Sequence, residues 1–375
     1  MTRIIHFAIL LVILFGCKKS SSDSTPDTIT NNPRALGADI SLLPNFEKAG
    51  AIDKDQDGKT VSLLPHFKEN GFNFVRIRLF VNPDLKSTAC QDLAYVTDLC
   101  LKAKSQGFQL LLDFHYSDTW ADPSKQFKPG EWINLSPADL STKLYNYTKT
   151  TLEALKSQGI VPEMIQPGNE ITPGMLWDTG RVSLWNDQWN TPDHWKSFAD
   201  LLKNAIKACR EVCPQAKIII QTERSGDAVA TKNYYLKMAD YGIGYDVIGL
   251  SYYPFWHGSF TDVEKTINMA AIDFPLKPVM FVEIAYPFND WGYPSDALIP
   301  KPYPSTPEGQ AAFLTGFIGM INKHSNVTGL FYWYPEETFS PNGGIYPILH
   351  RGLFDNTTGR ALPGLYVMKK FLTFP

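Results

Sequence analysis

FNFVRIRLFVNPDLKSTACQDLAYVTDLCLKAKSQGFQLLLDF, residues 72–114, contains the unit that decides the fold. Phe72–Leu79 and Phe108–Phe114 are apolar runs with the length of a buried strand. Asp92–Lys104, between them, has a helix-like pattern. A strand, a helix and a second strand in this order predict two parallel strands joined by a crossover helix.

The same alternation recurs along the chain. The predicted strands are Arg34–Asp39, Phe72–Leu79, Phe108–Phe114, Glu163–Pro167, Lys217–Thr222, Asp246–Tyr252, Pro278–Ile284 and Gly329–Trp333. The predicted helices are Asp92–Lys104, Pro137–Gln158, Thr191–Val212, Thr231–Tyr241, Val263–Ala271 and Pro307–Lys323. Eight strands alternating with helices predict a (β/α)₈ TIM barrel. No Pro-, Gly- or Ser-rich linker divides residues 34–375, which we interpret as one domain.

The residues before this domain resemble an export signal. Residues 1–16 (MTRIIHFAILLVILFG) are one Arg and an apolar run too short to span a membrane. Cys17 follows in the string LFGC, which resembles a lipobox and predicts a lipid-anchored, exported protein of the outer membrane or cell surface. The alternative is an ordinary signal cut nearby, with Cys17 incidental. Residues 17–33 are polar and predict a flexible tether.

Composition narrows the classes of function. The net charge is −3, so the chain has no excess of basic residues, and this argues against a nucleic-acid-binding protein. Four further cysteines, Cys90, Cys100, Cys209 and Cys213, have no zinc-ligand spacing with His. Export would permit disulfides, but Cys209 and Cys213 lie four apart on a predicted helix, an awkward geometry for one. A tethered barrel needs no partner subunit, so we expect a monomer without a required cofactor.

Polar and aromatic residues occur at most of the predicted strand ends. In barrels of this type the chemistry lies at the carboxyl ends of the strands. One buried charge can be a paired structural group, but a ring of them indicates a site. The ring consists of Asp39, Arg76, Arg78, Asp113, His115, Asn169, Glu170, Glu223, Tyr252, Tyr253, Glu283 and Trp333.

Glu170 and Glu283 end the fourth and seventh predicted strands, whose ends face one another across a barrel mouth. Two carboxylates facing across a cleft are what glycosidic bond cleavage requires, one as acid and the other as nucleophile or base. Their surroundings must keep the two pKa values apart. Arg76 and Tyr253 are candidates to hold Glu283 ionised.

Several longer strings resemble glycoside hydrolase family 53, the arabinogalactan endo-β-1,4-galactanases, over residues 36–371. GNE at Gly168–Glu170 is shared by many barrel glycosidases, and the string of the third strand is the most distinctive. The strings are GADIS (Gly37–Ser41), GFNFVRIRLFVNP (Gly71–Pro83), LLDFHYSDTWADPSKQFKP (Leu111–Pro129), GNE, SYYPFWHG (Ser251–Gly258), VEIAYPF (Val282–Phe288) and GLFDNTTGRALPGL (Gly352–Leu365). Ile284 and Phe80 depart from the family's frequent Thr and Trp.

The resemblance implies hydrolysis of the β-1,4-galactan side chains of pectin with net retention. Glu170 is implied as the acid/base and Glu283 as the nucleophile, and Asn169 as the partner of the sugar 2-hydroxyl. The remaining predicted substrate-binding residues are Asp39, Arg76, His115, Trp120, Tyr253, Trp256 and Trp333. Trp120 and Trp256 are chosen because their motifs flank strand ends. Trp132, Trp177, Trp185, Trp189 and Trp291 are weighed equally as sugar platforms or loop packing.

Two calcium sites are considered. Some bacterial members of the family hold calcium after the seventh strand, where Asp290 and Asp296 offer oxygen here. Asp53, Asp55, Asp57 and Gly58 mimic the start of an EF-hand loop, but Leu64 replaces the closing Glu, so we interpret a solvated turn.

Other functions stay open at this point. Another glycosidase of the clan, a mannanase or xylanase, would use the same carboxylates. A surface lipoprotein that binds polysaccharide without cutting it would not need both of them. A metal-dependent hydrolase would need clustered His ligands, and only His115 is at a strand end.

Overall fold

The computed structural model describes residues 34–342 and 348–373. The predicted leader (1–16), tether (17–33) and lipidation site Cys17 lie outside the described residues. In the described ranges no helix is both long and apolar enough to cross a membrane.

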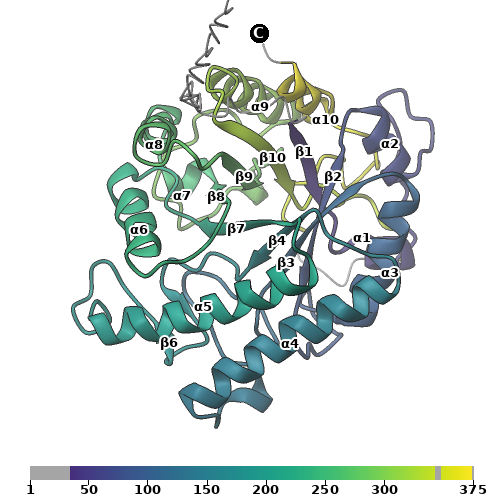
Figure 1. The fold of residues 1–375 in the computed structure, drawn as a ribbon. Helices are drawn as coiled ribbons and strands as arrows, with labels where there is room; N and C mark the ends of the chain where they lie inside the picture. The colour runs from purple at the N-terminus through teal and green to yellow at the C-terminus, as the bar shows by residue number, and fades with distance from the viewer. Residues whose placement is uncertain (1–33, 343–347, 374–375) are drawn as a thin grey trace, which may run out of the picture. The chain divides into compact units, whose positions relative to one another are not determined.

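Eight parallel strands form a closed barrel in the order β1-β10-β9-β8-β7-β4-β3-β2, with helices around it (Figure 1). The predicted (β/α)₈ barrel is confirmed. β1 lies between β10 and β2 and thereby closes the sheet. The strands are β1 (Ala35–Asp39), β2 (Phe74–Leu79), β3 (Gln109–Phe114), β4 (Met164–Pro167), β7 (Lys217–Thr222), β8 (Val247–Tyr252), β9 (Val279–Ile284) and β10 (Val327–Trp333).

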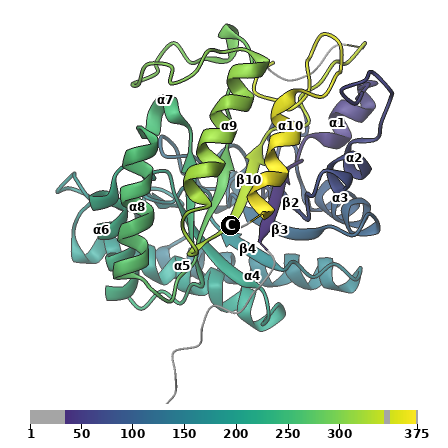
Figure 2. The same ribbon diagram turned by 90° about the horizontal axis from the view of Figure 1, so that it is seen from above.

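Helices on the outside cover the sheet, and α8, α9 and α10 lie side by side (Figure 2). Side chains cap many of the helix starts; Asp92 accepts from the N–H of Tyr95, and Thr191 from that of His194. The helices are α1 (Leu43–Lys48), α2 (Leu63–Glu69), α3 (Leu93–Ser105), α4 (Pro137–Ser157), α5 (Pro192–Val212), α6 (Ala228–Asp240), α7 (Pro254–His257), α8 (Phe260–Asp273), α9 (Pro307–Ile321) and α10 (Pro363–Met368).

The loops contain several short elements. β5 (Gly174–Met175) and β6 (Gly180–Arg181) form a small antiparallel pair between β4 and α5. The single-turn 3₁₀ helices are η1 (Gly130–Trp132), η2 (Asp290–Gly292) and η3 (Lys369–Leu372).

The core has an inner and an outer layer. The inner cluster takes residues from every barrel strand and therefore fills the barrel: Ala35, Phe74, Leu111, Met164, Ile219, Val247, Met280, Val282 and Phe331. A larger cluster lies between the sheet and the helices. Cys90, Cys100, Cys209 and Cys213 are all buried, and Cys100, Cys209 and Cys213 are free thiols.

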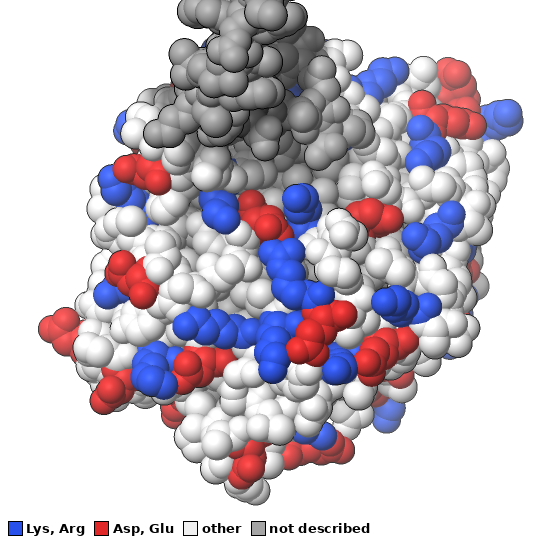
Figure 3. Space-filling view, in the orientation of Figure 1, with Lys and Arg blue, Asp and Glu red and all other residues white. Residues whose placement is uncertain are grey.

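The face of the molecule seen in Figure 3 carries basic and acidic side chains intermingled, without a large patch of either sign. This distribution matches the near-neutral charge of the sequence.

Candidate active site

Arg76, in β2, is the electrostatic centre of the barrel mouth. Its Nη1 lies 2.7 Å from Asp39 Oδ2, and its Nη2 lies 2.8 Å from Asp113 Oδ2 and 2.9 Å from Glu283 Oε1. Nη2 also donates to Asn169 Oδ1 at 2.8 Å. Burial acts to lower the pKa of Arg76, but the three carboxylates raise it above its ordinary value. Arg76 therefore stays charged, and it joins the ends of β1, β2, β3 and β9 to the loop after β4.

Glu283 is surrounded by donors. Besides Arg76, the amide Nε2 of Gln221 donates to its Oε1 at 3.0 Å, and Tyr253 Oη donates to its Oε2 at 2.8 Å. Three donors, one of them a cation, therefore fix both oxygens of the Glu283 side chain.

A β-bulge directs Glu283 into the mouth. Leu250 and Ser251 are consecutive in β8, but their partners in β9 are Phe281 and Glu283. The extra residue, Val282, belongs to the inner cluster. Strict alternation would turn the residue after Val282 outward, and a bulge re-aims such a side chain.

Glu170 has different surroundings. It follows β4 with φ +47°, in the left-handed region. Its backbone N–H donates to Gln221 Oε1 at 2.9 Å, and its carboxylate Oε1 accepts from Ser251 Oγ at 2.6 Å. Burial raises the pKa of Glu170 well above its ordinary value, and the charges of Glu283 and Glu223 raise it further. Its surroundings thus favour the protonated form.

Gln221, in β7, connects the two glutamates. Its Oε1 accepts from the backbone of Glu170, and its Nε2 donates to Glu283 Oε1 and, at 3.0 Å, to Ser251 Oγ. Two carboxyl groups with contrasting surroundings therefore share a single hydrogen-bond network. Such a contrast is what glycosidic bond cleavage by a pair of carboxyl groups requires.

Asn169 and His115 are fixed before any ligand arrives. Asn169 Nδ2 donates to the carbonyl of Ala121 at 2.8 Å. His115 Nδ1 accepts from the N–H of Ala121 at 3.1 Å, which puts its proton on Nε2, 3.2 Å from Asp113 Oδ2. The loop after β3 thus holds both side chains in place.

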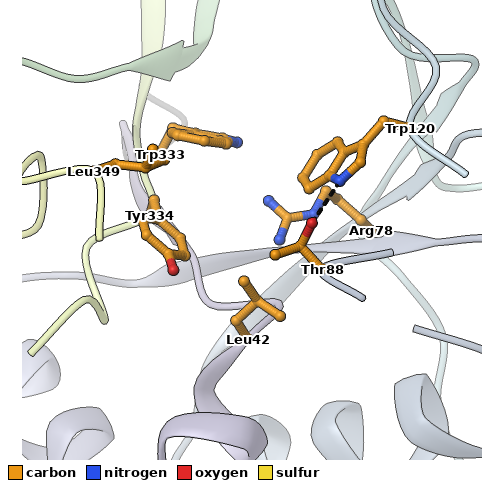
Figure 4. A pocket seen from close by; sticks show the side chains of 7 residues that line it. All are labelled: Leu42, Arg78, Thr88, Trp120, Trp333, Tyr334 and Leu349. Carbon is orange, nitrogen blue, oxygen red and sulfur yellow. Dashed lines mark hydrogen bonds between the residues drawn. The ribbon is translucent and has the colours of Figure 1, made fainter. Parts of the chain in front are cut away.

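A pocket of about 280 Å³ opens beside this network. Figure 4 shows Trp120 and Trp333 on opposite sides of it, with the Arg78 guanidinium under Trp120. The guanidinium lies 4.6 Å from the Trp120 ring centre and 3.2 Å from Asp39. Its three nitrogens have no hydrogen-bond partner among the described residues, although the side chain is buried. The lining residues are Leu42, Arg78, Thr88, Trp120, Trp333, Tyr334 and Leu349.

The pocket adjoins the carboxylates through aromatic contacts. The ring of Trp333 meets that of Tyr253 edge-on at 6.2 Å. Trp256 lies farther out, 37% exposed, with its ring 6.0 Å from that of Tyr253. The structure thus groups the predicted site residues Asp39, Arg76, His115, Trp120, Asn169, Glu170, Tyr253, Trp256, Glu283 and Trp333 at one end of the barrel.

One aromatic prediction is wrong. Tyr252 points outward, where its ring stacks on Phe317 at 4.9 Å, because strand alternation gives the opposite direction to its neighbour Tyr253. For Trp132, which was weighed equally as platform or packing, the structure shows packing, because its side chain is fully buried against Tyr147.

The calcium candidates have mixed outcomes. Asp290 pairs with Lys301, which already neutralises it. Residues 34–342 and 348–373 contain no group of three or more His, Cys, Asp or Glu arranged for a metal, and calcium near Asp290 and Asp296 stays a prediction. In the EF-hand-like segment, Asp55 accepts backbone N–H groups of Asp57 and Lys59, as in a turn. Asp53 is not solvated as expected: burial raises its pKa to about 7.

Sequence reasoning missed Gln166, Gln221, Ser251 and Glu336. Gln166 Nε2 donates to Asp113 Oδ1 at 2.6 Å and to Gln221 Oε1 at 2.7 Å, and so extends the network. For Gln166 and Gln221, the signal available was an amide directly after apolar residues in the strings MIQP and KIIIQT.

Glu336, beyond β10, should make the domain less stable as the pH rises. Its Oε1 accepts from the N–H of Leu42 at 2.9 Å, and burial, with the nearby charge of Asp39, raises its pKa to about 8. The ordinary value is 4.5, so between about pH 4.5 and 8 the folded state keeps a proton that the unfolded state releases. The protonated Glu336 contributes on the order of a few kcal/mol to the free energy of unfolding. This contribution is fully present below about pH 4.5 and disappears as the pH rises to about 8.

Glu336→Gln replaces this carboxyl with a neutral amide. We expect the variant to lose less stability than wild type between pH 5 and 8, measured by urea unfolding. Glu308→Gln, at an exposed position in α9, is the control and should follow wild type. Parallel curves for Glu336→Gln and wild type would contradict the assignment.

Comparisons with known proteins match the geometry. The model of glycosyl hydrolase family 53 matches residues 35–368. An arabinogalactan endo-β-1,4-galactanase of Thermothelomyces thermophilus is 32% identical over 353 residues, 89% of this chain and 98% of that protein. Among solved structures, the family 53 catalytic domain of Ignisphaera aggregans superposes with a TM-score of 0.80 at 33% identity, covering 91% of this chain and 97% of that one.

A fungal β-1,4-galactanase superposes with a TM-score of 0.75 at 31% identity, over 90% of this chain and 99% of its own. The matched residues include both glutamates and every barrel strand. The chain therefore belongs to glycosyl hydrolase family 53.

Proposed function

We propose that the protein is a retaining endo-β-1,4-galactanase that hydrolyses the β-1,4-galactan side chains of pectin. The observation that carries the proposal is the contrast between two carboxyl groups in one network: Glu283 is held by three donors, and Glu170 is buried with a raised pKa. The galactanase names of the relatives support the substrate.

In the first step, Glu283 attacks the anomeric carbon while Glu170 protonates the leaving glycosidic oxygen. A covalent galactosyl-enzyme forms and the leaving half of the chain departs. In the second step, Glu170, now ionised, takes a proton from water, which displaces Glu283 from the anomeric carbon. Two inversions give net retention.

The other residues bind and orient. Arg76 and Tyr253 hold Glu283 with its oxygens fixed. Asn169 donates one amide hydrogen to Ala121, which leaves the second for a sugar 2-hydroxyl. Trp333 and Trp120 offer flat faces to a sugar ring in the pocket, and Arg78 offers donors to its hydroxyls.

Export and anchoring are part of the proposal. The leader and Cys17 would place the barrel on a polar tether at the outer membrane or cell surface, as a monomer without a required cofactor. Incorporation of labelled fatty acid into wild type, but not into Cys17→Ser, is the expected result.

A timed digest tests substrate and mode of action together. We expect β-1,4-galactan to lose viscosity early while a ladder of oligosaccharides appears, and NMR to show the β-anomer first. Mannan and xylan serve as controls for the two alternative glycosidases. If galactan is not cut, or if mannan or xylan is cut faster, the proposed substrate is wrong.

A further inference from the structure

The loop between β4 and α5 presents one indole to solvent at the barrel mouth. Trp185 is 57% exposed, an unusual position for so large an apolar ring. The turn is fixed because Ser183 Oγ accepts from the backbone N–H groups of Trp185 and Asn186. The Arg224 guanidinium, beyond the end of β7, stacks on the ring at 4.5 Å. The indole is therefore held in place although it is exposed.

The other two Trp of this loop have a different environment. The ring centres of Trp177 and Trp189 lie 4.3 and 4.5 Å from the Arg181 guanidinium. Both rings are half-buried, and Trp177 Nε1 donates to the carbonyl of Pro173. Loop packing accounts for these two, but it does not account for Trp185.

A chain of contacts leads from Trp185 to Glu170. Arg224 Nε lies 2.7 Å from Glu223 Oε1 as an ion pair. Glu223 Oε2 accepts from Thr172 Oγ1 at 2.7 Å, and Thr172 is two residues beyond Glu170. Trp185 thus belongs to the side of the mouth that holds the proposed acid.

The closed strand order sets the two sides apart. In that order β7 is opposite β1, and β4 is opposite β10. The pocket of Arg78, Trp120 and Trp333 is built on β1, β2, β3 and β10, next to Glu283 on β9. Trp185 and Arg224 are built on the β4 and β7 side, next to Glu170. The two carboxyl groups therefore lie between the pocket and Trp185.

We infer that Trp185, braced by Arg224, is the binding surface for the leaving half of the glycan. The inference rests on the proposed function, because the acid protonates the oxygen that stays with the leaving half. The nucleophile bonds to the other half, whose next sugar takes the pocket. A galactose ring has a face of C–H groups that stacks on indole, and the bracing guanidinium lowers the entropy lost on stacking.

Trp185→Ala tests this with two substrates. We expect kcat/KM for galactotetraose and galactan to fall about tenfold, the usual scale of one lost aromatic contact. With β-galactobiosyl fluoride the leaving group is a fluoride ion, which cannot stack on indole. We expect kcat/KM for this substrate to match wild type.

Leu276→Ala is the matched control. Leu276 is 85% exposed in the turn before β9, at the end of the barrel away from the mouth, so both substrates should be unaffected. An equal loss on both substrates, or no loss on either, would overturn the inference. Failure of the proposed function is distinct, because wild type itself would then not cleave galactan.

Discussion

Glu283→Ala should lose nearly all turnover of galactan, about 10⁴-fold or more in kcat, because no covalent intermediate can form without the nucleophile. The sugar platforms and Arg76 remain, so binding of galacto-oligosaccharides should stay near wild type. Calorimetry for binding and reducing-sugar release for turnover measure the two effects separately.

A small anion distinguishes a missing nucleophile from a damaged site. Azide fits the space left by the carboxylate and can attack the anomeric carbon of a dinitrophenyl β-galactobioside from the face that Glu283 uses. The carbon–nitrogen bond forms as the dinitrophenolate leaves, which gives an α-galactobiosyl azide. Glu308→Ala, at an exposed site on α9, should keep wild-type turnover and form no azide product. Near-wild-type activity of Glu283→Ala would refute its assignment as nucleophile.

Glu170→Gln should separate substrates by how much help their leaving group needs. Galactan leaves as a poor alkoxide and depends on protonation, so its kcat/KM should fall about 10²–10⁴-fold. A dinitrophenyl β-galactobioside leaves without a proton, and its kcat/KM should stay within about tenfold of wild type. Steady-state kinetics on the two substrates give the comparison.

The pH profile supplies a second measure of Glu170. Burial and nearby negative charge raise the pKa of Glu170, so wild-type kcat/KM on galactan should decline only above the usual range of a carboxyl group. The residual activity of Glu170→Gln should lack that decline, while Glu308→Gln should keep it. Equal losses on both substrates would contradict the role of acid.

The strands were predictable because burial imposes their pattern. Each of the eight predicted strands ends at the residue at which the structure ends it. The helix boundaries were predicted less accurately. For example, α6 begins at Ala228 and not at Thr231, because the N-cap residue Asp227 was not considered. α1 and α2 are one or two turns long and fall below the length at which a helical period is visible.

The two carboxylates were easier to identify from the sequence than the side chains that hydrogen-bond to them. A Glu after an apolar run stands out, but Gln221 is a neutral side chain within one, and its role follows only from two strands brought together by the fold. The bulge before Glu283 depends on register between β8, β9 and β10, which no local pattern encodes. Likewise, Tyr252 and Tyr253 are identical neighbours, and which of the two faces the barrel mouth depends on the register of β8 in the sheet.

Arg76 has a consequence for how this barrel can diversify. One cation pairs with carboxylates from three strands, so replacing any one carboxylate changes the charge balance around the other two. We therefore expect the four residues to be kept or lost together during evolution. The segment 171–190 carries none of these charges. New preferences for polymer length or branching can therefore arise there by drift and selection without disturbing the chemistry.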